Sequence, residues 1–247
     1  HNLFSLKDDC QGSDPVFRNP GIVHGSRICF LMYLGQCTGN WSDVADGITY
    51  AVDASGPLAD KLVINLSLGG SATSSEKSIV VDAIDYARAQ DAIIVAAAGN
   101  YGPAEPMFPA SLPGVIAISA TDSADRPASM KSPDVPFSSQ YGDLGAPGVF
   151  VFSTMPLWVS SIGPYGEPPY YRYMSGTSMA TPLVASAASL VWSIHPEYSA
   201  FQVKLALLKN VDVPGDWDLL YGVGRLNVER AVTAPEIVLQ HVYLPLT

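Results

Sequence analysis

Short apolar runs alternate with amphipathic stretches along most of this chain. Apolar runs bounded by turn residues predict strands at 27–34, 61–68, 92–100, 115–122 and 143–154. Residues 43–54 and 75–90 have helical spacing, and in the second stretch a serine cap precedes apolar residues at Ile79, Ala83, Ile84 and Ala87. This alternation predicts an α/β domain with a mainly parallel sheet.

Residues 177–196, TSMATPLVASAASLVWSIHP, give the clearest helical prediction. Pro182 is expected only in the first turn, where no backbone N–H is needed, so the helix should begin close to Ser178. A serine at this position is most often a helix cap. It can also be a nucleophile, because the unpaired N–H groups of a helix start stabilise a developing negative charge.

Composition and charge exclude several classes of protein. The 247 residues are 48% apolar and 15% charged, and no repeat or linker divides them, so one globular domain is expected. The net charge of -10 weighs against nucleic-acid binding, which depends on Lys and Arg. No apolar run approaches the roughly 20 residues that a membrane helix needs, so no membrane partner is expected. The stretch 160–173, rich in Pro and Tyr, is predicted to be a surface loop.

Three cysteines allow at most one internal disulfide. Cys29 lies in an apolar run and is expected to pack as a small hydrophobe, which leaves Cys10 and Cys37, both in loop-like sequence, as the candidate pair if a disulfide forms. No C-x-x-C, H-E-x-x-H or close histidine pair occurs, so no metal site is predicted.

The residues around Ser178 resemble the nucleophile segment of the subtilisin-like serine proteases (peptidase S8), whose pattern is G-T-S-M-A-x-P followed by a small-residue helix. Further matches to that family follow in the same order: VINLSLGG (63–70), AIIVAAAGN (92–100) and YGVGRLNVERAV (221–232). The resemblance is nearly continuous over 21–232. The other known arrangement, the G-x-S-x-G elbow of α/β-hydrolases, fits poorly because GTSMA ends in Ala180.

The resemblance implies a three-layer subtilisin-like fold with a mainly parallel central sheet. It implies one N-terminally incomplete domain over 1–247, with 233–247 as a C-terminal tail. Ser178 would be the nucleophile, and Asn100 would donate its amide to the oxyanion beside the Ser178 N–H; without the resemblance, Asn100 would be taken as a turn residue. Phe108–Pro109 resembles a site where the family has a cis peptide.

The family's substrate groove maps onto short segments of this chain. The first specificity pocket would be lined by Ser67, Leu68, Gly69, Ala97, Ala98 and Gly99, and the opposite edge by Thr38 and Gly39. A pocket lined by Gly and Ala predicts that large substrate side chains are accepted. No cofactor is identified. Calcium is considered only because family members often bind it, and no calcium-ligand loop of the family is matched in this sequence. The family's secreted members favour a location outside the cytoplasm.

The family motifs that carry the aspartate and the histidine, D-T-G or D-S-G and H-G-T-H-V-A-G, do not occur. A serine hydroxyl needs a histidine base, and the histidine needs a carboxylate that holds its tautomer. His1 precedes Gly21 by about the family's spacing and is the candidate base in this chain, although HNLFSLKDDC lacks the rest of the motif. Its candidate partners are Asp8, Asp9 and Asp14. The remaining histidines are assigned no catalytic role: His24, His241 and His195, the last as the C-terminal cap of the nucleophile helix.

In this family the aspartate strand lies between the strands that 27–34 and 61–68 resemble. Either another chain supplies it, or these two strands pair directly in a reduced sheet. Three functions remain open. In the first, the chain is the serine-bearing part of a protease that hydrolyses peptides or proteins, with Asp and His on a separate N-terminal chain. In the second, it is a pseudoprotease that binds peptides or a partner through the retained groove. Or it is an unrelated serine esterase, which needs a nearby His and Asp.

Overall fold

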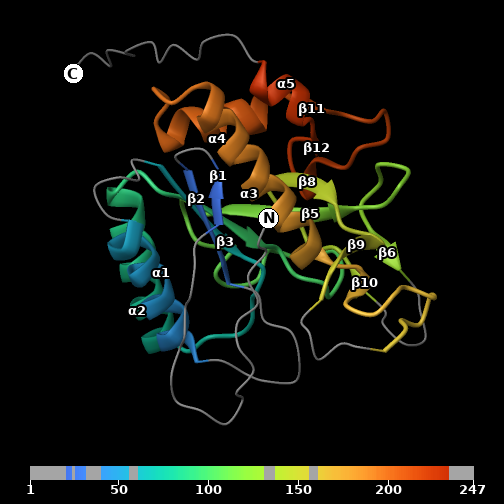
Figure 1. Cartoon of the computed structure of the whole chain (residues 1–247), viewed down its shortest axis with the longest axis horizontal. Helices are drawn as coiled ribbons and strands as arrows, with labels where there is room; N and C mark the ends of the chain where they lie inside the picture. Colours follow the sequence, from blue (N-terminus) through green and yellow to red (C-terminus); the bar gives the residue numbers. More distant parts are fainter. Residues whose placement is uncertain are drawn as a thin grey trace.

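An eight-stranded sheet forms the centre of the protein, with the strand order β1-β2-β3-β4-β5-β8-β12-β11 (Figure 1). The computed structural model describes residues 21–23, 26–31, 40–55, 61–130, 137–155 and 161–233. All pairs from β2 through β12 are parallel, whereas β1 and β11 pair antiparallel at the two edges. The strands are β1 Gly21–Val23, β2 Ser26–Leu31, β3 Lys61–Leu66, β4 Ile93–Ala97, β5 Ile116–Thr121, β8 Leu144–Pro147, β11 Val211–Asp212 and β12 Arg225–Leu226.

Helices cover both faces of the sheet and give three layers. Because successive strand residues point to opposite faces, Val63, Val95 and Ile118 pack in one apolar cluster, and Ile64 and Ile94 pack in the other. The first cluster lies under α3 (Thr177–Ile194), α4 (Ala200–Lys209) and α5 (Val228–Val232). The second lies under α1 (Trp41–Ser55) and α2 (Ser74–Ala89). The predicted α/β architecture with a mainly parallel sheet is confirmed.

The start and the buried face of α2 differ from the prediction. Its N-cap is Thr73, not a serine, and Thr73 forms a capping box with Glu76. Its buried residues are Val80, Ala83, Ile84 and Ala87, whereas Ile79 is 46% exposed. The apolar pair Ile79–Val80 lets the periodicity be placed with either residue inward, and packing selects Val80.

The predicted strand at 143–154 is two strands that belong to different sheets. β8 ends at Pro147, and β9 (Val151–Thr154) forms an antiparallel hairpin with β10 (Tyr171–Met174). The stretch 160–173, expected to be a surface loop throughout, therefore ends in a strand. A second short hairpin joins β6 (Ser129–Met130) to β7 (Phe137–Ser138), and the short helix η1 spans Leu219–Tyr221.

β2 and β3 pair directly over six residues, from Ser26 opposite Lys61 to Leu31 opposite Leu66. No strand lies between them in the part of the chain described. Of the two alternatives for the missing aspartate strand, the structure thus has the reduced sheet.

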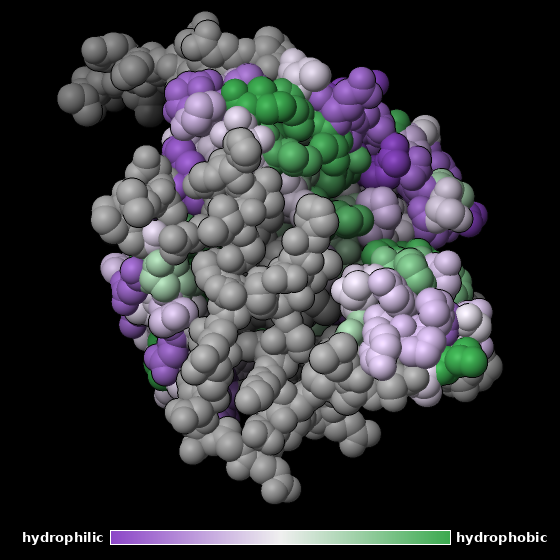
Figure 2. All heavy atoms as spheres, viewed as in Figure 1, coloured by the Kyte–Doolittle hydropathy of each residue, from purple (hydrophilic) through white to green (hydrophobic). Residues whose placement is uncertain are grey.

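α3 is long and apolar enough to cross a membrane by length and composition, but 56% of it is buried inside the protein. Burial against the first cluster identifies it as the core helix of the domain. Apolar side chains gather over α3 and α4 on the face seen in Figure 2, and the large exposed ones on these helices are Leu183, Leu190, Ile194 and Phe201.

Candidate active site

Ser178 is the second residue of α3 and does not cap it. The N-cap is Gly176, and no side chain makes a capping hydrogen bond at this end. Ser178 is half-buried, and within the described part of the chain its Oγ has no hydrogen-bond partner. The capping role weighed for Ser178 is therefore wrong, and its hydroxyl is left available for chemistry.

Asn100 lies beside the start of α3, where the chain leaves β4. Its Oδ1 accepts hydrogen bonds from the backbone N–H of Thr177 at 2.9 Å and from the Thr177 hydroxyl at 3.1 Å. Since both bonds need an acceptor, they fix the orientation of the amide and leave Nδ2 as a donor. Gly176 has φ +148, a backbone conformation that residues with a side chain rarely adopt, so a glycine suits this position beside Asn100.

Thr177 connects Asn100 to the end of β4. Its hydroxyl accepts a hydrogen bond from the Gly99 N–H at 3.1 Å while donating to Asn100 Oδ1, and the residue is fully buried. Nothing in the sequence singles out Thr177, because a threonine one residue before a serine has no distinguishing spacing. The contact with Asn100, 77 residues earlier, is visible only in the structure.

Ser67 supplies a hydrogen bond that the helix itself cannot make. In a regular helix the Ser178 carbonyl would accept from the N–H of residue 182, but Pro182 has none. The Ser67 hydroxyl donates to that carbonyl instead, at 2.9 Å, and accepts from Asn65 Nδ2 at 2.9 Å. The expectation that Pro182 requires the first turn is therefore wrong, because Pro182 is the sixth residue of α3.

The two predicted walls of the specificity pocket are joined by one segment. Along the first wall, Gly70, next to Gly69, donates its N–H to the Phe108 carbonyl at 2.9 Å. Along the second wall, the Ala98 carbonyl accepts from the Met107 N–H at 2.8 Å. The Phe108–Pro109 peptide is cis, as expected from the resemblance. The wall residues are Ser67, Leu68 and Gly69 on one side and Ala97, Ala98 and Gly99 on the other.

Glu167 holds the hairpin that leads into Ser178. It is 2% exposed, and its carboxylate accepts from the backbone N–H of Tyr173 at 2.9 Å and of Tyr165 at 2.8 Å. The bond from Tyr173 lowers the pKa of Glu167 most, and its own backbone N–H, that of Tyr165 and the charge of Arg172 lower the pKa further, against the opposing effect of burial. Glu167 was missed from the sequence, where it is one charged residue in a stretch rich in Pro and Tyr.

His195, the one histidine among the described residues, cannot act as the base. His195 caps the far end of α3 from Ser178, about 25 Å away at 1.5 Å per residue. Its ring stacks on Tyr198 at 4.5 Å, and Nε2 lies 3.2 Å from the Val232 carbonyl oxygen. The predicted role as a C-terminal cap is confirmed. Several predicted residues lie outside those described: the candidate base and its partners (His1, Asp8, Asp9, Asp14), the groove residues Thr38 and Gly39, the cysteines Cys10 and Cys37, and the histidines His24 and His241.

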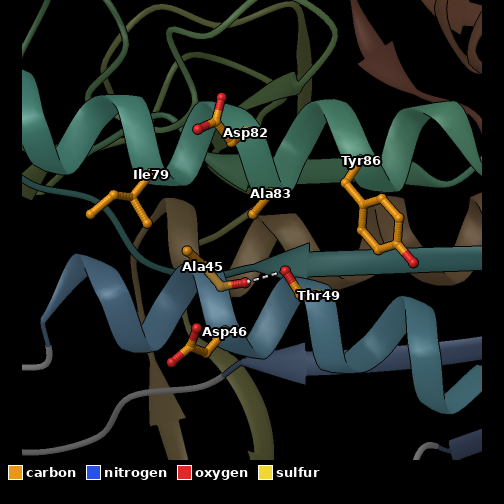
Figure 3. Close-up of a pocket in the computed structure, with 7 residues that line it drawn as sticks. All are labelled: Ala45, Asp46, Thr49, Ile79, Asp82, Ala83 and Tyr86. Atoms are coloured by element: carbon orange, nitrogen blue, oxygen red, sulfur yellow. Dashed lines mark hydrogen bonds between the residues drawn. The ribbon is translucent and has the colours of Figure 1, made fainter.

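A concave feature lies between α1 and α2, on the opposite side of the sheet from α3 (Figure 3). The Thr49 hydroxyl in this groove donates to the Ala45 carbonyl of its own helix at 3.0 Å. It is therefore not poised as a nucleophile. Within the described ranges, no three His, Cys, Asp or Glu side chains are grouped so as to hold a metal ion. The groove is lined by Ala45, Asp46, Thr49, Ile79, Asp82, Ala83 and Tyr86.

Comparison with known proteins places this arrangement in a family. Residues 10–224 match the family model of the subtilase family, peptidase S8. The chain is 35% identical over 198 residues to thermitase of Thermoactinomyces vulgaris, covering 79% of this chain and 61% of the relative. It is 34% identical over 227 residues to an extracellular protease of Xanthomonas campestris pv. campestris, covering 87% of this chain and 36% of the relative.

Solved structures agree with the sequence matches. A structure described as proteases from Pseudoalteromonas arctica superposes with a TM-score of 0.66 at 30% identity, covering 81% of this chain and 60% of that one. This chain spans less than two thirds of each of these relatives. The family match extends over most of the chain and includes Ser178 and Asn100, and the chain therefore belongs to the subtilase family.

Proposed function

We propose that this chain is the serine-bearing part of a subtilisin-like endopeptidase that hydrolyses peptide bonds of peptides or proteins. The observation that carries the proposal is the fixed Asn100 amide, whose Oδ1 is held by Thr177 beside the start of the Ser178 helix. Two donors, Asn100 Nδ2 and the Ser178 N–H, are then available to one oxyanion. Membership of the subtilase family leaves no support for an unrelated serine esterase.

In the proposed reaction, Ser178 Oγ attacks the carbonyl carbon of the scissile peptide bond, and its proton passes to a histidine base. The carbonyl oxygen gains the negative charge and accepts hydrogen bonds from the two donors. The bond to the leaving amine then breaks as the base returns the proton, and water hydrolyses the acyl-enzyme. His195 lies too far from Ser178 to act as the base. We therefore propose that the Asp and His come from outside this chain. The alternative candidate for the base, within the chain, is His1.

We also propose action outside the cytoplasm, because one relative is named an extracellular protease. The substrate would lie as an extended segment against Ser67, Leu68 and Gly69, where a peptide can add as a strand. Of these, Gly69 is exposed and Leu68 is half-buried, so their backbone is within reach of a bound peptide.

A second candidate, a pseudoprotease that binds peptides without cleaving them, is favoured by one observation. β2 and β3 pair directly where the family resemblance implies the aspartate strand. A strand inserted from another chain would have to break the pairing between β2 and β3, which extends over six residue pairs. If that exchange does not occur, the groove persists and Ser178 lacks its base.

Hydrolysis of fluorogenic peptides distinguishes the two candidates. The chain is assayed alone and together with the segment of thermitase that this chain does not match. Ser178→Ala is the matched control. Turnover by the wild type that is absent in Ser178→Ala supports the protease. Peptide binding without turnover in either form favours the pseudoprotease. Turnover that persists in Ser178→Ala contradicts the assignment of Ser178.

A further inference from the structure

The hairpin of β9 and β10 presents aromatic side chains on one face. It forms a two-stranded sheet of its own, at the lower right of Figure 1. Phe152 lies opposite Tyr173, and Tyr171, two residues earlier in β10, shares their face. Phe150, just before β9, packs edge-on against Tyr173 at 6.4 Å and against Tyr165 at 5.4 Å between ring centroids. We call these five residues the aromatic ladder.

The rings of the aromatic ladder contact one another and remain exposed. Phe152 stacks on Tyr171 at 5.4 Å and meets Tyr173 at 4.9 Å between ring centroids. The five residues are nevertheless between 38% and 61% exposed. In the part of the chain that the structure describes, no group hydrogen-bonds to the hydroxyls of the three tyrosines. Ring surface and hydroxyl groups are therefore both available to a partner, a combination typical of protein interfaces.

The hairpin receives little support from the rest of the described structure. β9 and β10 contact each other extensively, and neither makes more than slight contact with another described element. The hairpin is tied to the chain before α3, where Ser175 Oγ accepts from the Phe150 N–H at 2.8 Å. Because an isolated two-stranded hairpin is only marginally stable in water, packing of its aromatic face against a partner would stabilise it.

Two aromatic residues at the starts of these strands have a backbone conformation that bulky side chains disfavour. Phe150 has φ +51 and Tyr170 has φ +70, and they immediately precede β9 and β10. Positions of this kind are usually taken by glycine or asparagine. Phe150 is 48% exposed and Tyr170 is 42% exposed, so burial within the chain does not offset the strain. Strained positions cluster at functional sites, which agrees with a binding role for this face.

Charge favours a second copy of this chain as the partner. The chain has a net charge of -10, but no member of the aromatic ladder is charged. Glu167 is buried, and Arg172 lies on the opposite face of β10, where its guanidinium donates to the Ser161 carbonyl at 2.9 Å. Two copies can therefore meet here without bringing carboxylates together, whereas the face offers no ionic complement to a charged partner.

The exposed area is large enough for a weak dimer. At about 200 Å² for an aromatic side chain, the aromatic ladder exposes roughly 500 Å², near the upper end for the largest apolar patch on a monomer. Two copies would bury about 1,000 Å² from the ladder alone, which is the size of transient interfaces. We propose that two copies of this chain associate through the aromatic ladder, face to face about a two-fold axis.

Sedimentation equilibrium of the purified chain, from about 1 to 300 µM, measures the association. The wild type should form a dimer with a dissociation constant of about 10–100 µM. Phe152→Lys places like charges opposite each other at the centre of the face and should weaken the dimer at least about 10-fold. Phe201→Lys on α4, where the phenylalanine is 56% exposed, is the matched control and should leave the dissociation constant unchanged.

Hydroxyl-radical footprinting of the wild type locates the contact, and so tests the proposal even if Phe152→Lys does not fold. Tyr171 and Tyr173 should become protected as the chain concentration rises, whereas Tyr101, outside the aromatic ladder and 85% exposed, should stay equally reactive. A chain that remains monomeric, a dimer without this protection, or equal dissociation constants for folded Phe152→Lys and Phe201→Lys would overturn the proposal. The measurement needs no catalytic base, so its result is independent of the proposed protease activity.

Discussion

Replacing Ser67 by alanine removes two hydrogen bonds at once. The Ser67 hydroxyl donates to the Ser178 carbonyl and accepts from Asn65 Nδ2. The carbonyl cannot turn to its usual helical donor, because that residue is Pro182. Asn65 is fully buried, and its Oδ1 already lacks a partner. Ser67→Ala therefore leaves two further polar groups unpaired.

The size of the effect follows from the burial of these groups. An orphaned buried donor or acceptor costs about 1–3 kcal/mol, so Ser67→Ala should lower the free energy of unfolding by about 3 kcal/mol. For a domain of this size, that change corresponds to roughly 6–12 °C in Tm. Ser189 is the matched control, since it is 1% exposed and its Oγ has no partner among the described residues. Ser189→Ala removes an unsatisfied hydroxyl and should be neutral or stabilise by up to about 1 kcal/mol.

Urea unfolding followed by tryptophan fluorescence measures both variants against the wild type. The predicted result is a large loss for Ser67→Ala and none for Ser189→Ala, with equal dependence on urea concentration. If Ser67→Ala lay within about 0.5 kcal/mol of the wild type, or if the two variants lost equal stability, the hydrogen-bonding argument around Ser178 would be refuted.

Three further predictions concern the same region and the closing motif. Thr177→Val should lower the free energy of unfolding by about 2 kcal/mol, because it leaves the buried Gly99 N–H without an acceptor. Thr181→Val, one turn later, loses only a hydrogen bond to a helical carbonyl and should lower it by under about 1 kcal/mol. Urea unfolding measures both variants. The pKa of Glu167 is lowered in the folded state, so its carboxylate stabilises the protein at pH values above the unfolded pKa of about 4.3, and this contribution is lost as the pH falls through the folded pKa. The difference in Tm between the wild type and Glu167→Gln should therefore vanish at low pH. A difference that stays constant with pH would contradict this. Gly222→Ala should cost more than about 2 kcal/mol, since φ is +113 and the Cβ would lie 2.5 Å from backbone atoms, whereas Gly102→Ala, with φ +102 and open space, should cost about 1 kcal/mol by thermal unfolding.

The sequence predicted the features that depend on local pattern. Alternating apolar runs located the parallel strands, and the small-residue stretch after Ser178 located α3. The position of Asn100 beside that helix followed from the family resemblance, and its hydrogen bonds to Thr177 are consistent with it. These features depend on residues that are close in the chain or that form a known motif.

What the sequence left undetermined depends on contacts between distant residues. The donor that replaces the missing N–H of Pro182 is Ser67, 111 residues away from the Ser178 carbonyl that it reaches. The apolar residues at 143–154 do not reveal that β8 joins the central sheet while β9 pairs with β10. The position of Met107 and Phe108 likewise depends on hydrogen bonds to two distant segments, from the Met107 N–H to Ala98 and from the Gly70 N–H to Phe108, which no periodicity encodes.

The central claim, that Ser178 is the nucleophile of a protease site, is tested most directly by covalent labelling. A fluorophosphonate probe is added to the folded chain, alone and with the thermitase segment that has no counterpart in it, and the adduct is located by peptide mass spectrometry. The account predicts one adduct, on Ser178, that increases when the second polypeptide is present and is absent in Ser178→Ala. A folded chain that remains unlabelled at Ser178 in both samples, or an adduct that survives in Ser178→Ala, would contradict it.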